Sequence, residues 1–156
     1  MRPIVLLSLL ALTLAAATPD PVSWKLEQTP AKPVRAGATF TVKLIGRIQD
    51  GWHMYSMKTM EGGPVATRVW VPAGQSFQQA GAIKSSEPET MRDATLDMDV
   101  ELYKDAATFA IPVKPAAGAA AGAASLAIDV SYQTCNNSLC LPPKTVKVEL
   151  PITISK

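Results

Sequence analysis

Apolar residues alternate with polar ones along most of the chain, and this period of two constrains the fold more than any other feature. Between residues 40 and 48, one face carries Phe40, Val42, Leu44, Gly46 and Ile48. The same alternation runs through residues 126–132 and residues 146–154. Successive side chains of a β-strand point to opposite faces, whereas the side chains of an amphipathic helix return to the same face about every 3.6 residues. Helical periodicity is nearly absent, so the sequence predicts an all-β protein.

Shorter alternating segments fill the rest of the chain, and proline and glycine separate them. They span residues 22–26, 52–55, 69–71 and 109–113. Asp50-Gly51 predicts a turn, and Pro112 predicts an edge strand or a bulge, because proline donates no hydrogen bond to a neighbouring strand. The Ala- and Gly-rich residues 115–124 predict a long hairpin loop. Short strands with this punctuation are typical of an immunoglobulin-like antiparallel β-sandwich, which is the fold we predict.

The first 17 residues have the features of a cleavable signal peptide. Arg2 supplies a positive start, residues 4–14 form an apolar run, and Ala15-Ala16-Ala17 offers small residues at a cleavage site. The run is too short to cross a bilayer core of about 30 Å, which takes roughly 20 residues. We therefore expect residues 1–17 to be a signal peptide. Residues 18–156 are then one secreted domain without a transmembrane segment, and the resemblance described below implies that its location is the periplasm.

The charge of the chain is small and excludes several classes of function. Fifteen basic and thirteen acidic residues give a formal net charge of +2 at pH 7. Without a basic cluster, neither nucleic-acid binding nor a polybasic membrane patch is expected. The single histidine makes a Ser-His-Asp arrangement untenable, and no glycine-rich phosphate loop is present. The acidic residues between Glu87 and Glu101 predict a solvated loop.

The two cysteines of the chain, Cys135 and Cys140, lie between the last two predicted strands. In an oxidising compartment they can pair, because Asn136, Asn137 and Ser138 are turn formers that bring the ends of the loop together. The spacing is not Cys-x-x-Cys, and no helix begins here to lower a thiol pKa. A loop this short stabilises a fold only slightly, since that contribution grows with loop length. The residues alone leave a structural disulfide and an exchange-active one both open.

The residues around the cysteines resemble those of a known family. The segment YQTCNNSLCLPPK, residues 132–144, is similar to the cysteine loop of the N-terminal periplasmic domain of the thiol:disulfide interchange protein DsbD. The segment DGWHMYS, residues 50–56, is similar to the strand across from those cysteines, and VELY, residues 100–103, gives a weaker match. The resemblance covers nearly all of residues 18–156. It implies an immunoglobulin-like fold with two cysteines that cycle between dithiol and disulfide.

The resemblance also implies roles and partners. By position, Cys140 would attack the disulfide of a partner and Cys135 would resolve the mixed disulfide. The partners would be thioredoxin-like periplasmic oxidoreductases, such as disulfide isomerases and cytochrome c maturation proteins, and no cofactor would be needed. The chain has no Cys-x-x-Cys and no second apolar span, so the membrane electron donor would be a separate protein. In the family a cap loop covers the cysteines with aromatic residues, and here Leu96 stands where a phenylalanine is expected.

Other site residues and other functions remain open beside the interchange function. Tyr55 and Tyr132 are expected either to surround the cysteines or to belong to the core. A secreted immunoglobulin-like binding module with a structural disulfide is the main alternative function. A third is copper binding, because thioether and imidazole ligands suit Cu(I). The candidate ligands are His53, Met54, Met57, Met60, Met91 and Met98. Residues three apart in a strand point to opposite faces, so these side chains could converge on one ion only if a loop follows Tyr55.

Overall fold

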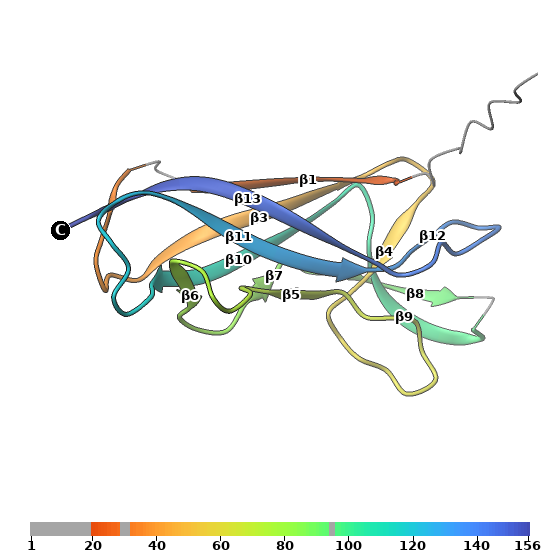
Figure 1. The fold of residues 1–156 in the computed structure, drawn as a ribbon. Coiled ribbons are helices and arrows are strands. Elements are labelled where there is room, and N and C mark those ends of the chain that lie inside the picture. The colour runs from red at the N-terminus through yellow and green to blue at the C-terminus, as the bar shows by residue number, and fades with distance from the viewer. Residues whose placement is uncertain (1–19, 29–31, 94–95) are drawn as a thin grey trace, which may run out of the picture.

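The computed structural model describes residues 20–28, 32–93 and 96–156, so the predicted signal peptide at residues 1–17 lies outside the described residues. Within them the chain forms thirteen β-strands and no helix, which confirms the all-β prediction (Figure 1). Accordingly, no helix in this part of the chain is long and apolar enough to cross a membrane. The strands are β1 (Val22–Gln28), β2 (Val34–Arg35), β3 (Phe40–Ile48), β4 (His53–Tyr55), β5 (Arg68–Trp70), β6 (Phe77–Gln79), β7 (Lys84–Ser85), β8 (Glu89–Asp93), β9 (Met98–Tyr103), β10 (Ala106–Pro115), β11 (Gly122–Tyr132), β12 (Thr134–Cys135) and β13 (Lys144–Ser155).

Two sheets form the body of the immunoglobulin-like sandwich, as predicted. The first has the order β1-β3-β10-β6, with β7 also paired to β10, and the second has the order β2-β13-β11-β5. The pairs are antiparallel except for the short parallel contact between β13 and β2. The predicted alternation sets which side chains enter the core. The inward faces of β3, β10 and β11 supply its centre, with Val42, Leu44, Phe109, Ile111, Val113, Leu126, Ile128 and Val130 all fully buried.

Gly46 interrupts the apolar face of β3 for a steric reason. A Cβ atom at this position would lie 2.7 Å from Cζ3 of Trp24, on the neighbouring strand β1. The indole ring occupies that space and packs against Phe109 and Tyr132, with ring centroids 6.2 and 5.2 Å away. Gly46 therefore lets a large aromatic side chain cross the face of the sheet.

The structure decides between the two alternatives predicted at Pro112. The residue lies in β10, which is a central strand, so the edge-strand alternative is wrong. Pro112 pairs regularly with Thr41 of β3, but on its other side residues 80–83, between β6 and β7, bulge out opposite only residues 111–112 of β10. A prediction that needs correction is the hairpin loop at residues 115–124. The strands extend into that segment, and residues 116–121 join β10 in one sheet to β11 in the other.

A third sheet, with the order β12-β4-β9-β8, closes one end of the sandwich beside the loop between β12 and β13 (Figure 1). Its two faces have different partners. Met54 and Tyr103 belong to the main core. On the opposite face, Tyr55 and Cys135 form a second cluster with Val100 and Leu102. This small sheet thus connects the sandwich to the cysteines.

Candidate functional site

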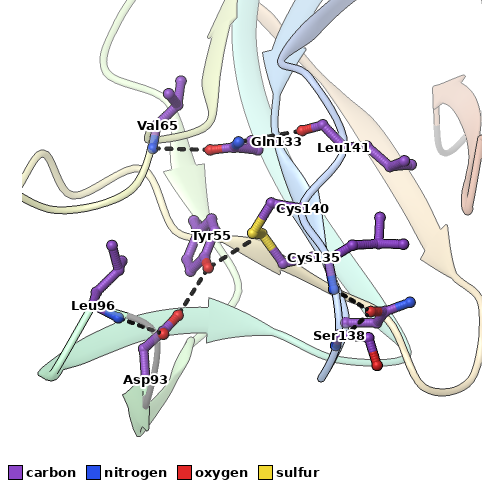
Figure 2. Close-up of a disulfide and its surroundings, with 11 residues drawn as sticks. Tyr55, Val65, Asp93, Leu96, Gln133, Cys135, Ser138, Cys140 and Leu141 are labelled. Atoms are coloured by element: carbon purple, nitrogen blue, oxygen red, sulfur yellow. Dashed lines mark hydrogen bonds between the residues drawn. A yellow bond between two sulfur atoms is a disulfide. The ribbon is translucent and has the colours of Figure 1, made fainter.

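The two cysteines form a disulfide, with their Cα atoms 4.0 Å apart. Asn136 closes the turn between them, as its residue type suggested. Its side-chain oxygen accepts hydrogen bonds from the backbone N–H groups of Ser138 and Leu139, at 2.8 and 2.9 Å (Figure 2). At the base of the loop, the N–H of Leu141 donates to the carbonyl of Thr134 at 2.9 Å. The turn holds the disulfide at the tip of the scaffold.

The two bonded cysteines differ in exposure. Cys135 is only 2% exposed, because β12 places it on the apolar floor made by Tyr55, Val100 and Leu102. Cys140, at the other end of the turn, is exposed. The rate of thiol–disulfide exchange depends on which sulfur an incoming thiolate can reach. Of the two residues, Cys140 is therefore the one that an incoming thiolate can approach more readily.

A buried hydroxyl group faces the sulfur of Cys135. The Tyr55 hydroxyl lies 3.3 Å from Sγ of Cys135 and 2.9 Å from Oδ2 of Asp93, on β8 (Figure 2). The other carboxylate oxygen of Asp93 accepts the backbone N–H of Leu96 at 3.1 Å. Burial, together with the hydrogen bond to Asp93 and its charge, raises the pKa of Tyr55 far above its ordinary value. The hydroxyl therefore stays protonated and remains a hydrogen-bond donor.

His53 stands next to this group on β4. Its Cα is paired with that of Cys135 across β4 and β12, and its ring meets the ring of Tyr55 edge-on at 5.3 Å. Burial lowers the pKa of His53, while the charge of Asp93 opposes that shift and the charge of Lys104 adds to it. At neutral pH the imidazole is therefore uncharged.

Hollows flank the disulfide on two sides. The larger, of about 540 Å³, is lined by both cysteines together with His53, Tyr55 and Asp93. The smaller, of about 240 Å³, contains Cys140 but not Cys135. Large apolar side chains are unusually exposed around these hollows. In the described part of the chain they are Val65, Met91, Leu96 and Leu139, which line a hollow or, for Leu139, adjoin Cys140.

Comparison with known proteins gives the family of the chain. The family model for the thiol:disulfide interchange protein DsbD, N-terminal, matches residues 24–152. The chain belongs to this family.

Two solved structures share the fold of this DsbD N-terminal family member. The N-terminal domain of DsbD from Neisseria meningitidis, in the reduced form, is 21% identical, with a TM-score of 0.50; the match covers 72% of this chain and 77% of that one. The N-terminal periplasmic domain of ScsB from Proteus mirabilis is 19% identical, with a TM-score of 0.52. That match covers 90% of this chain and 49% of the other. No curated protein matches the chain in sequence.

In this DsbD N-terminal family member, the expected cap residue Leu96 and Tyr55 lie beside the disulfide, whereas Tyr132 lies in the main core. Leu96 is 37% exposed and lines the smaller hollow with Cys140 and Tyr55. Tyr132 is fully buried in the main core. Its hydroxyl donates to Asp20 at 3.0 Å, and Lys144 donates to the same carboxylate at 2.7 Å. Tyr55 thus adjoins the disulfide, whereas Tyr132 anchors the base of the cysteine hairpin to the start of β1.

Sequence reasoning missed two residues of this site. The predicted solvated acidic loop is instead the β8–β9 hairpin, and its Asp93 is turned toward Tyr55. Gln133 accepts a hydrogen bond from the N–H of Val65 at 3.3 Å and donates one to the carbonyl of Leu141 at 3.2 Å (Figure 2). Gln133 thereby ties the wall of the smaller hollow to the cysteine hairpin. Its place directly after Tyr132 in the family motif was the available signal.

The methionine-rich set does not converge on one point. Met54 is fully buried in the main core, and Met57 packs against that core. His53 lies on the opposite face of β4, where Met91 lines the same hollow. Among the described residues, no three or more His, Cys, Asp or Glu side chains form a group suited to a metal ion. The proposed ligands His53 and Met54 are therefore separated by their own strand.

Proposed function

We propose that this chain is a periplasmic thiol:disulfide oxidoreductase module, with Cys135 and Cys140 as its redox pair. One observation carries the proposal: a disulfide between one exposed and one buried cysteine, bordered by two hollows. A disulfide that served only as a staple would gain nothing from an accessible sulfur. Membership of a thiol:disulfide interchange family supports the same conclusion.

The chemistry follows from the unequal access. A partner thiolate attacks Sγ of Cys140, the Cys135–Cys140 bond breaks, and the electron pair stays on Sγ of Cys135. The Tyr55 hydroxyl, 3.3 Å away, carries a single proton, which it can turn from Asp93 toward that new thiolate. The second thiolate of the partner then attacks its own sulfur in the mixed disulfide and releases Cys140. The module gains two electrons and two protons, and the partner becomes a disulfide.

In the reverse direction the reduced module reduces a partner. The Cys140 thiolate attacks the partner disulfide and forms a mixed disulfide, which Cys135 resolves by attacking Sγ of Cys140. The partner leaves as a dithiol. In this direction Cys140 is the nucleophile and Cys135 the resolving thiol.

The surroundings of Cys140 support a protein partner. Val65, Leu96 and Leu139 expose apolar surface beside the accessible sulfur. Exposed apolar clusters of this kind mark protein interaction sites. We infer that thioredoxin-like oxidoreductases dock here, among them disulfide isomerases and cytochrome c maturation proteins, and that a separate membrane protein supplies electrons. This role places the chain in the periplasm, with residues 1–17 as the signal peptide and residues 18–156 as the domain.

A trapping experiment tests the proposal. The Cys135→Ala variant keeps the accessible thiol and should form a mixed disulfide with a thioredoxin-like protein that lacks its own resolving cysteine. The Cys140→Ala variant keeps only the buried thiol and serves as the matched control. We expect a strong adduct from the first variant and little from the second. No adduct with any thioredoxin-like protein, together with a reduction potential below about −300 mV, would identify a structural disulfide instead.

A further inference from the structure

His53 lies beside the redox pair, yet the steps above do not use it. The pairing of His53 with Cys135 puts both side chains on the same face of the small sheet, because directly opposed residues of an antiparallel pair share a face. Both also line the larger hollow. It is the sole histidine of the chain.

The imidazole has an unused polar atom. Nε2 of His53 is buried and has no hydrogen-bond partner within residues 20–28, 32–93 and 96–156. Buried polar atoms normally have a partner, so an orphaned one at a reactive centre calls for an explanation. Ionisable groups from several elements line the same hollow: Asp50, Tyr55, Arg92, Asp93, Lys104 and Asp105.

The other groups near Cys135 are poorly suited to accept its proton. The Tyr55 hydroxyl holds its own proton tightly, since its pKa is raised by burial and by Asp93. The Asp93 carboxylate is engaged by the Tyr55 hydroxyl and by the N–H of Leu96. A neutral imidazole is the side chain whose basicity suits proton transfer near neutral pH.

We propose that His53 accepts the proton of the Cys135 thiol during the resolving step, across the hollow that both side chains line. The inference rests on the proposed interchange function. In the mixed disulfide, Sγ of Cys135 gives its proton to His53 and its electron pair attacks Sγ of Cys140. The Cys135–Cys140 bond forms, the partner sulfur leaves as a thiolate, and the imidazolium releases its proton to solvent. In the opposite direction the imidazolium returns a proton to Cys135.

A small disulfide reagent can separate the attack by Cys140 from the resolving step by Cys135. Reduced protein reacts with 5,5′-dithiobis(2-nitrobenzoate) first at Cys140, releasing one coloured thiolate, and then Cys135 expels the second. We expect His53→Gln to slow the second release by about tenfold or more, because general bases contribute at least that much. The first release should be unchanged. Met91→Leu, which alters the lining of the same hollow without touching an ionisable group, should match the wild type in both phases.

Nuclear magnetic resonance gives a readout that needs no variant. In untagged protein the one imidazole can be titrated in the oxidised form and after reduction with a phosphine. We expect the imidazole signals of the reduced form to show a second inflection at the pH where the cysteine thiols ionise, absent from the oxidised form, because the charges of adjacent groups affect each other. The lack of this second inflection, or an unchanged second release in His53→Gln, would overturn the inference. Failure of wild-type protein to exchange with thioredoxin-like proteins would instead overturn the interchange function and leave the coupling intact.

Discussion

The Tyr55 hydroxyl lies 3.3 Å from Sγ of Cys135, although 80 positions separate the two residues in the sequence. The contact exists because β4 and β12 are neighbours in the small sheet, and that sheet turns one face toward the disulfide. It joins the sulfur of the buried cysteine to a hydroxyl that stays protonated.

Replacing Tyr55 with phenylalanine should make the Cys135 thiolate less stable. A hydrogen bond to a charged group contributes about 1.5–3 kcal/mol, and one pKa unit corresponds to about 1.4 kcal/mol. We therefore expect Tyr55→Phe to raise the pKa of the Cys135 thiol by at least about one unit. Thiolate ultraviolet absorbance in a Cys140→Ser background measures it. Tyr132→Phe removes a hydroxyl that contacts Asp20 instead, so an equal shift there would contradict the assignment.

Leu96 should control how fast small thiols reach the disulfide. Its side chain lines the smaller hollow beside Cys140, and exchange rates depend on access to the attacked sulfur. We expect Leu96→Ala to speed reduction by dithiothreitol about two- to fivefold and Leu96→Phe to slow it. Stopped-flow measurement of thiol release gives both rates. If both substitutions leave the rate unchanged, Leu96 does not act as a cap.

Asp20 should make the stability of the domain dependent on pH in the acid range. Burial raises the pKa of Asp20, but hydrogen bonds from Lys144, Tyr132 and Val22 outweigh it, and the net pKa lies below the ordinary 3.8. A carboxyl whose pKa is lower in the folded state contributes stability that is fully present above the unfolded pKa of about 3.8 and is lost as the pH falls from there through the lower pKa of the folded state.

Urea unfolding of Asp20→Asn at neutral and at acid pH tests this dependence. The variant should lose about 1 kcal/mol at neutral pH, and its deficit relative to the wild type should shrink near about pH 3. Lys144→Met should reproduce part of the loss, whereas Lys147→Met, an exposed lysine on the same strand, should not. A deficit that is constant with pH would contradict the role of the carboxylate.

Gly46 should tolerate no side chain while Trp24 is present. The added Cβ of Gly46→Ala would lie 2.7 Å from the indole, and such overpacking costs about 1–3 kcal/mol. Thermal unfolding should show a loss of this size with little change in exchange chemistry. In a Trp24→Phe background the same substitution should cost less, because the smaller ring leaves room. Additive losses would show that the two residues do not compete for space.

Local pattern predicted the body of the fold well, because the side-chain period of a strand is a local property. The alternation in β3, β11 and β13 identified their buried faces correctly. Residues 115–124 were misassigned to a hairpin, since alanine and glycine carry no information about which sheet the chain enters next.

The site was harder to predict, because its contacts join distant segments. Tyr55 and Tyr132 both lie in strand-like segments of the family motifs. Only Tyr55 is on the sheet face that meets the disulfide, and Tyr132 points into the main core. Asp93 lay in an acidic run typical of solvated surface, and its partner Tyr55 is 38 positions away. The cysteines were evident as the two cysteines of the chain, and their redox role was inferred from the resemblance of the surrounding motif to a family.

The disulfide joins residues only five positions apart, within a single turn. Opening it frees very little chain, and the burial of Phe109, Ile111 and Ile128 at the heart of the sandwich does not depend on it. If the proposed interchange takes place, the domain can therefore be reduced and reoxidised repeatedly without passing through a loosened state that would invite proteolysis or aggregation. The chemistry would be confined to a short ring outside the core, with four residues between its two cysteines.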